Sequence, residues 1–193
     1  MSEEKIVITG MGSLSSIGNN LTELKEALLS GKLGSKPATV FNTEGFDSVV
    51  NCEVKTFNPE QYIKYTPIES LGRTSQFSIA ATKMALEDAG LTSTALKGQR
   101  IPVSIGTTDG ESQHLDALAK VWVTKGLSEL DGELVEQSTA SNLANSISKE
   151  FGLTGESITV STACSAGNYA IGHAFDLLKT GAANIAICGG ADA

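Results

Sequence analysis

One stretch of the sequence places a potential nucleophile, Cys164, where a strand is expected to turn into a helix. Residues 157–168 read Ser-Ile-Thr-Val-Ser-Thr-Ala-Cys-Ser-Ala-Gly-Asn, a β-branched run followed by small residues around Cys164. Apolar residues at helical spacing then continue to Thr180. We expect a strand, a sharp turn and a helix, with Cys164 at the helix N-terminus. Unpaired N–H groups and the helix dipole there favour a thiolate, and the Cys164 N–H would be placed to donate to a developing oxyanion.

The same position also fits a buried structural thiol packed between strand and helix, and position alone leaves both interpretations open. Neither of the two imidazoles supplies a base. His173 lies nine positions beyond Cys164 on the same predicted helix, roughly 13 Å along its axis. His114 lies in a polar loop-helix junction. Because a general base must come within hydrogen-bond reach, we interpret both as structural or surface groups. Cys188 lies in an apolar run and is predicted to be a core thiol.

Composition excludes several classes of function. The three Cys and two His residues are irregularly spaced, without a C-x-x-C pair, so no metal site is expected and the thiols are expected to be free. The formal net charge is −8 without a basic stripe, which argues against a nucleic-acid partner or a membrane surface. No apolar stretch approaches the length of a membrane span, and the charged residues 1–5 do not form a signal peptide. We predict a cytoplasmic protein.

Strand-like and helix-like segments alternate along the chain. The predicted strands are apolar on both faces, which is typical of a mostly parallel sheet covered by helices on both faces. Residues 32–72, with three of the four prolines, are predicted to be irregular. The predicted strands are 5–9, 101–105, 157–161 and 184–188, and the predicted helices are about 20–31, 74–89, 111–126, 138–151 and 166–180.

An ordered set of motifs resembles the β-ketoacyl-acyl carrier protein synthases, or ketosynthases. Within that family the resemblance is to the fatty-acid elongating type and its polyketide relatives, and it covers nearly the whole chain. The motifs are Val7-Ile-Thr-Gly-Met-Gly12, Ile17-Gly-Asn19, Arg73-Thr-Ser-Gln-Phe77, Glu87-Asp-Ala-Gly90-Leu91, Thr162-Ala-Cys-Ser-Ala-Gly167, Ile171-Gly-His-Ala174 and Gly181 to Asp192.

The resemblance implies a thiolase-like α/β fold, of which residues 1–193 are the N-terminal portion, the first half of a duplicated architecture. It implies that Cys164 receives an acyl group from the phosphopantetheine arm of an acyl carrier protein, with no cofactor of the chain's own. Malonyl-acyl carrier protein would then lose carbon dioxide and attack the thioester. The family's two catalytic His residues belong to the second half, so a complementary chain or fragment is expected. A homo- or heterodimer through the strand 157–161 is also implied.

The family pattern assigns a gate to the acyl pocket at Thr108 and Asp109, and here the sequence departs from it. An apolar residue usually stands where Asp109 does. A carboxylate beside a long alkyl chain is costly unless it is paired or points to water. The substrate is therefore short, polar or polyunsaturated, or Asp109 turns away from the pocket. Alternatively, Asp109 caps the helix that follows.

Two other functions remain open. A thiolase or a chalcone-synthase-like enzyme shares the implied fold. A structural subunit similar to a chain-length factor would shape the pocket of an active partner, although such subunits typically lack the Cys. The sequence leaves the acyl chain, the pathway and the identity of the partner chain undetermined.

Overall fold

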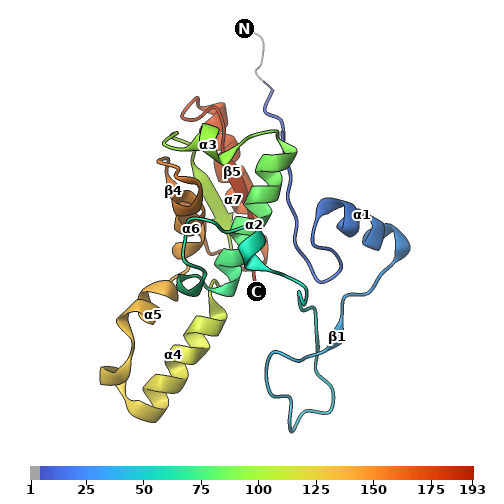
Figure 1. The fold of residues 1–193 in the computed structure, drawn as a ribbon, viewed down its shortest axis with the longest axis vertical. Helices are drawn as coiled ribbons and strands as arrows, with labels where there is room; N and C mark the ends of the chain where they lie inside the picture. Colours follow the sequence, from blue (N-terminus) through green and yellow to red (C-terminus); the bar gives the residue numbers. More distant parts are fainter. Residues whose placement is uncertain (1–4) are drawn as a thin grey trace.

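The computed structural model describes residues 5–193, in which helices cover both faces of a parallel sheet (Figure 1). The strands are β3 (Val103–Gly106), β4 (Ser157–Val160) and β5 (Ile187–Gly190), in the order β4-β3-β5. All are parallel, and Val103 lies opposite both Ser157 and Ile187. Their carboxyl ends therefore lie at one edge of the sheet. This arrangement confirms the predicted fold class.

The two faces of β3 contact different helices because successive side chains point to opposite sides. Val103 and Ile105 join the hydrophobic core with α2 (Arg73–Asp88) and α6 (Asn142–Phe151). Gly106 faces α7 (Ala166–Lys179) on the other side. The main core comprises Ile63, Leu71, Ile79, Leu86, Leu96, Ile101, Val103, Ile105, Leu143, Ala144, Ile147, Phe151 and Leu153.

The predicted helices form close to their predicted bounds. Helix α1 (Leu21–Ser30) begins where the Asn20 side chain accepts a hydrogen bond from the Glu23 N–H, and it ends at Gly31 with φ of 67°. Residues 32–72 are irregular, as predicted, apart from short elements. These are the antiparallel pair β1 (Lys36–Pro37) and β2 (Val50–Asn51), and the 3-10 turns η1 (Pro59–Gln61) and η2 (Ile68–Ser70).

A helical arm extends away from the body of the molecule (Figure 1). It contains α4 (Ser112–Lys125), the 3-10 turn η3 (Leu127–Glu129) and α5 (Gly132–Gln137). The helix predicted at 138–151 begins at Asn142 instead, and Asp131 caps a separate short helix before it. A further short helix, α3, spans Ser93–Leu96. No helix within residues 5–193 is long and apolar enough to span a membrane.

The strand predicted at residues 5–9 does not form. Val7 and Ile8 are 68% and 80% exposed, and no described strand pairs with this segment. The chain instead passes along α2, where a Cβ on Gly10 would lie only 2.1 Å from the Ala85 carbonyl oxygen. A β-branched run needs a neighbouring strand to form a ladder, and the described chain offers none at this place. The strand predicted at 184–188 forms later in the chain, as β5 at Ile187–Gly190.

Candidate active site

Cys164 lies on an exposed elbow between β4 and α7. A 3-10 turn, η4 (Ala163–Ser165), connects the strand to the helix, and Cys164 is exposed. Ala163 has φ of +52° and is the only non-glycine residue of the described chain with a positive φ. A left-handed conformation costs about 1–2 kcal/mol for a residue with a Cβ, so the elbow is strained at Ala163 by about this amount. The predicted strand, turn and helix are confirmed, and Cys164 is not buried between them.

The elbow leaves hydrogen-bond donors beside the sulfur. Within residues 5–193 the Cys164 N–H makes no backbone hydrogen bond, and no side chain caps the N-terminus of α7. The Ser165 hydroxyl donates to the Thr162 carbonyl at 3.2 Å and the Ala166 N–H donates to the Ala163 carbonyl, which orders the turn and leaves the Cys164 N–H unused. Unpaired N–H groups at a helix N-terminus attract anionic oxygen, so this geometry can bind an oxyanion formed at an atom attached to Sγ.

Three glycines allow the start of α7 to lie directly on the sheet. A Cβ on Gly106 would lie 2.1 Å from the Ala166 carbonyl carbon, and one on Gly190 would lie 3.2 Å from the Gly167 Cα. Side chains at the ends of β3 and β5 would therefore push the helix away. This close backbone contact determines where the elbow, and hence Cys164, lies relative to the strand ends.

Gly106→Ala is expected to destabilise the fold by about 1–3 kcal/mol, because the new methyl group overlaps backbone atoms that cannot move aside. Gly172→Ala is the matched control on α7, since a Cβ there meets nothing within 4 Å. That control should be neutral or stabilising by up to about 1 kcal/mol. Thermal unfolding of both variants measures the difference, and equal midpoints would contradict the assigned packing.

The loop Thr107–Glu111, hereafter the gate loop, follows β3 at the same edge of the sheet. The Thr107 N–H donates to the Val160 carbonyl at 3.0 Å, so the loop begins beside the strand that leads to Cys164. Thr108 and Asp109 are both exposed. The Asp109 carboxylate has no hydrogen-bond partner within residues 5–193, and no side chain caps α4. The capping alternative for Asp109 therefore finds no support.

The other candidate residues lie on α4, α7 and β5. His114 is in the first turn of α4 and His173 is well along α7, each half-buried with an Nδ1 that has no partner in the described chain. Cys188 is exposed on β5, so its prediction as a core thiol is wrong. The sequence pattern of β5 is that of a buried strand, but this edge strand is only partly covered by the described residues.

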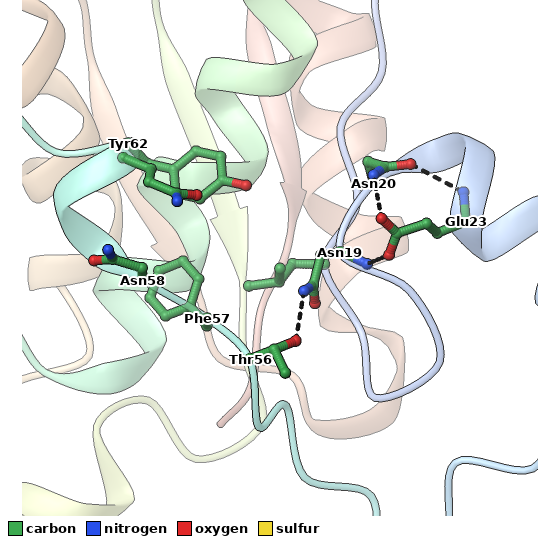
Figure 2. Close-up of a pocket in the computed structure, with 9 residues that line it drawn as sticks. Asn19, Asn20, Glu23, Thr56, Phe57, Asn58 and Tyr62 are labelled. Atoms are coloured by element: carbon green, nitrogen blue, oxygen red, sulfur yellow. Dashed lines mark hydrogen bonds between the residues drawn. The ribbon is translucent and has the colours of Figure 1, made fainter.

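A polar cavity of about 200 Å³ lies elsewhere, between the start of α1 and the segment around η1 (Figure 2). Its polar groups bond to one another: the Asn19 side-chain amide donates to Thr56 Oγ1 at 2.8 Å, and Asn20 caps α1. These hydrogen bonds give the polar residues of the cavity a structural role. Its lining contains neither Cys164 nor the gate loop and consists of Leu14, Asn19, Asn20, Glu23, Thr56, Phe57, Asn58, Gln61 and Tyr62.

The parallel sheet and the elbow Cys place the chain in the thiolase-like class of folds. It superposes on "The ishigamide ketosynthase/chain length factor" with a TM-score of 0.91 and 40% identity, over 97% of this chain and 47% of that one. A β-ketoacyl synthase from Burkholderia phymatum has the same fold, with a TM-score of 0.78 at 24% identity, over 91% of this chain and 43% of that one. The sequence profile of "Beta-ketoacyl synthase, N-terminal domain" matches residues 3–193. The chain therefore belongs to the β-ketoacyl synthase family.

Curated relatives include two enzymes named 3-oxoacyl-(acyl-carrier-protein) synthase 2. The one from Vibrio cholerae is 33% identical over 192 residues, and the one from Synechocystis is 30% identical over 193 residues. Each match covers 100% of this chain and 46% of the relative. The chain thus spans about half the length of the curated relatives it matches.

Proposed function

We propose that Cys164 is the acyl-accepting nucleophile of a ketosynthase that carries out decarboxylative condensation in fatty-acid or polyketide synthesis. The observation that carries this proposal is the exposed Cys164 on a strained elbow, with a backbone N–H of its own that has no partner within residues 5–193. Membership of the family and the names of the relatives support the reaction class. The residues of this chain account for the acyl-transfer half of the chemistry.

In the first step the Cys164 thiolate attacks the carbonyl carbon of an acyl thioester. The carbonyl oxygen becomes an oxyanion, which the Cys164 N–H stabilises by donating a hydrogen bond. The tetrahedral intermediate collapses with loss of the phosphopantetheine thiolate of the carrier protein, which takes up a proton. The acyl chain is then held on Sγ as a thioester.

In the second step a malonyl thioester loses carbon dioxide, and the resulting carbanion attacks the acyl carbonyl carbon. The bond to Cys164 breaks, and a β-ketoacyl thioester leaves the enzyme. Neither imidazole forms a hydrogen bond with the elbow within residues 5–193, so we assign the polar groups that assist decarboxylation to a complementary C-terminal half. The exposed Asp109 carboxylate does not serve as that group, because it would repel a malonyl carboxylate.

The proposed partners are an acyl carrier protein, the complementary half and a second ketosynthase-type subunit. One fold neighbour, with a TM-score of 0.79 and 24% identity, is a type II polyketide synthase acyl-carrier protein in complex with its ketosynthase. β4 pairs with β3 on one side only within the described chain, so its other edge is available for a homo- or heterodimer.

A structural, chain-length-factor-like subunit is the second candidate, because a similar solved structure is titled a ketosynthase/chain length factor. Thiol alkylation of the assembled protein followed by peptide mass spectrometry separates the two. As a nucleophile, Cys164 should be alkylated faster than Cys52, which is also exposed and serves as the internal control. A Cys164 that stays unmodified while Cys52 reacts would favour the structural subunit.

Asp109→Ile is expected to raise elongation of long saturated primers relative to short or polar ones. The unpaired carboxylate opposes an alkyl chain in its vicinity, and removing it should shift the preference by about 1–3 kcal/mol, or roughly 5–150-fold. The measurement is the ratio of kcat/KM for long and short acyl primers in the assembled enzyme. Asp109→Asn separates the effect of charge from that of shape. An unchanged chain-length profile in both variants would refute the gate assignment.

A further inference from the structure

Asp192 makes an unusual contact for a residue just beyond the end of a strand. One carboxylate oxygen, Oδ1, accepts three hydrogen bonds from the gate loop. The donors are the Thr107 hydroxyl at 2.8 Å, the Thr108 N–H at 2.8 Å and the Asp109 N–H at 3.2 Å. Bonds from backbone N–H groups to a carboxylate are charge-assisted and stronger than neutral ones. The chain beyond β5 therefore holds the backbone of the loop that follows β3.

The far end of the gate loop is held by different groups. The Thr107 hydroxyl oxygen accepts from the Gly110 N–H at 2.9 Å, and Thr74 Oγ1 donates to the Gly110 carbonyl at 2.7 Å. The buried Glu111 carboxylate accepts from the N–H groups of Thr74 and Ser75 at the start of α2. The loop is thus anchored at both ends, while the side chains of Thr108 and Asp109 stay exposed.

We propose that Asp192 is a positioning residue that fixes the gate loop at the sheet edge where β4 leads into the Cys164 elbow, and thereby sets which acyl chains the site accepts. This inference rests on the proposed function. Asp192 accepts hydrogen bonds from the backbone of Thr108 and Asp109, so we assign its effect to the position of the loop. Without it, two N–H groups lose their acceptor and the loop gains freedom at its start. The Asp109 carboxylate can then move away from the acyl chain, and the enzyme discriminates less strongly against long saturated acyl chains.

Glu150 supplies a matched control for the loss of a loop-holding carboxylate. It is buried and accepts from the N–H groups of Lys64, Tyr65 and Thr66, at 2.6 to 3.2 Å. It lies near the end of α6, a helix that is followed by the start of β4, whereas Cys164 and the gate loop follow the strand ends. Glu150→Ala therefore removes a similar set of bonds away from the elbow.

The experiment compares Asp192→Ala, Asp192→Asn and Glu150→Ala in the complete enzyme. Amide hydrogen exchange is the first measurement, because it reports the loop directly and needs no turnover. Exchange at Thr108 and Asp109 should rise about tenfold in Asp192→Ala and stay unchanged in Glu150→Ala. The second measurement is the kcat/KM ratio of long saturated to short primers. This ratio should rise about threefold in Asp192→Ala, less in Asp192→Asn, which keeps an acceptor oxygen, and not at all in Glu150→Ala.

Unchanged exchange in Asp192→Ala overturns the inference, and so does faster exchange with an unchanged primer ratio. An equal change of the ratio in Glu150→Ala also overturns it, since the effect would then follow from general destabilisation. Should Asp192→Ala not fold, Asp192→Asn decides by the same two measurements. Failure of the proposed function has a different signature, a wild-type enzyme that neither acylates Cys164 nor condenses, and it removes the basis of this inference as well.

Discussion

Cys164→Ala should lower condensation by at least about 1000-fold in the assembled enzyme, because the variant lacks the thiol proposed to accept the acyl group. The methyl group of Ala is accommodated readily on an exposed elbow, so the variant should fold as the wild type does. The measurement is turnover of acyl and malonyl thioesters into β-ketoacyl product. Cys164→Ser, which keeps a weaker nucleophile, should fall close to the Ala variant.

Cys52→Ala and Cys188→Ala are the controls for this prediction. Both thiols are exposed, and neither belongs to the elbow. Each control should retain nearly full turnover. A loss of condensation in Cys188→Ala as large as that in Cys164→Ala would indicate that Cys188 on β5 can be the nucleophile. That result would contradict the assignment to Cys164.

The second large effect concerns residues 1–193 taken alone, which we expect to show no condensation. Helix α7 presents alanines to the sheet, with Ala166, Ala170 and Ala174 buried. Three of its large apolar side chains, Tyr169, Ile171 and Phe175, are exposed instead. A helix with small residues inward and large apolar residues outward requires a second covering layer. We infer that a complementary half packs there and brings the groups that assist decarboxylation.

Thermal unfolding and malonyl decarboxylation of the 193 residues alone, and with a separately expressed complementary half, test this expectation. The isolated chain should unfold at low temperature or aggregate, and the complement should restore both a cooperative transition and activity. A cooperative monomer that decarboxylates and condenses without any partner would refute the dependence on a second half.

Much of the fold could be predicted from local patterns. Helices α2 and α7 have apolar residues at helical spacing, and the glycines that follow them, Gly90 and Gly181, have φ of 69° and 74°. The elbow could be predicted because a β-branched run, a set of small residues and a helical stripe succeed one another around Cys164. These signals all lie within about 25 residues of chain and depend little on distant contacts.

The contacts that hold the gate loop were not predictable in the same way. Asp192 is 85 positions from Thr107, and Glu111 is 37 from Thr74, so only the tertiary structure brings each carboxylate to its donors. The prediction of a strand at residues 5–9 was wrong for a related reason. A run with high strand propensity forms a strand only where another strand lies beside it. Likewise, an apolar pattern led to the prediction that Cys188 is buried, but burial of β5 depends on neighbours that the described residues do not supply.

The most direct test of the central claim is the location of the covalent acyl adduct. The assembled enzyme is incubated with an acyl-carrier protein bearing a defined acyl group, without malonyl thioester, and its intact mass and peptides are analysed. We expect this chain to gain the mass of one acyl group, on the peptide that contains Cys164, and Cys164→Ala to gain none. An adduct on another residue, or wild-type acylation of Cys164→Ala, would contradict the account.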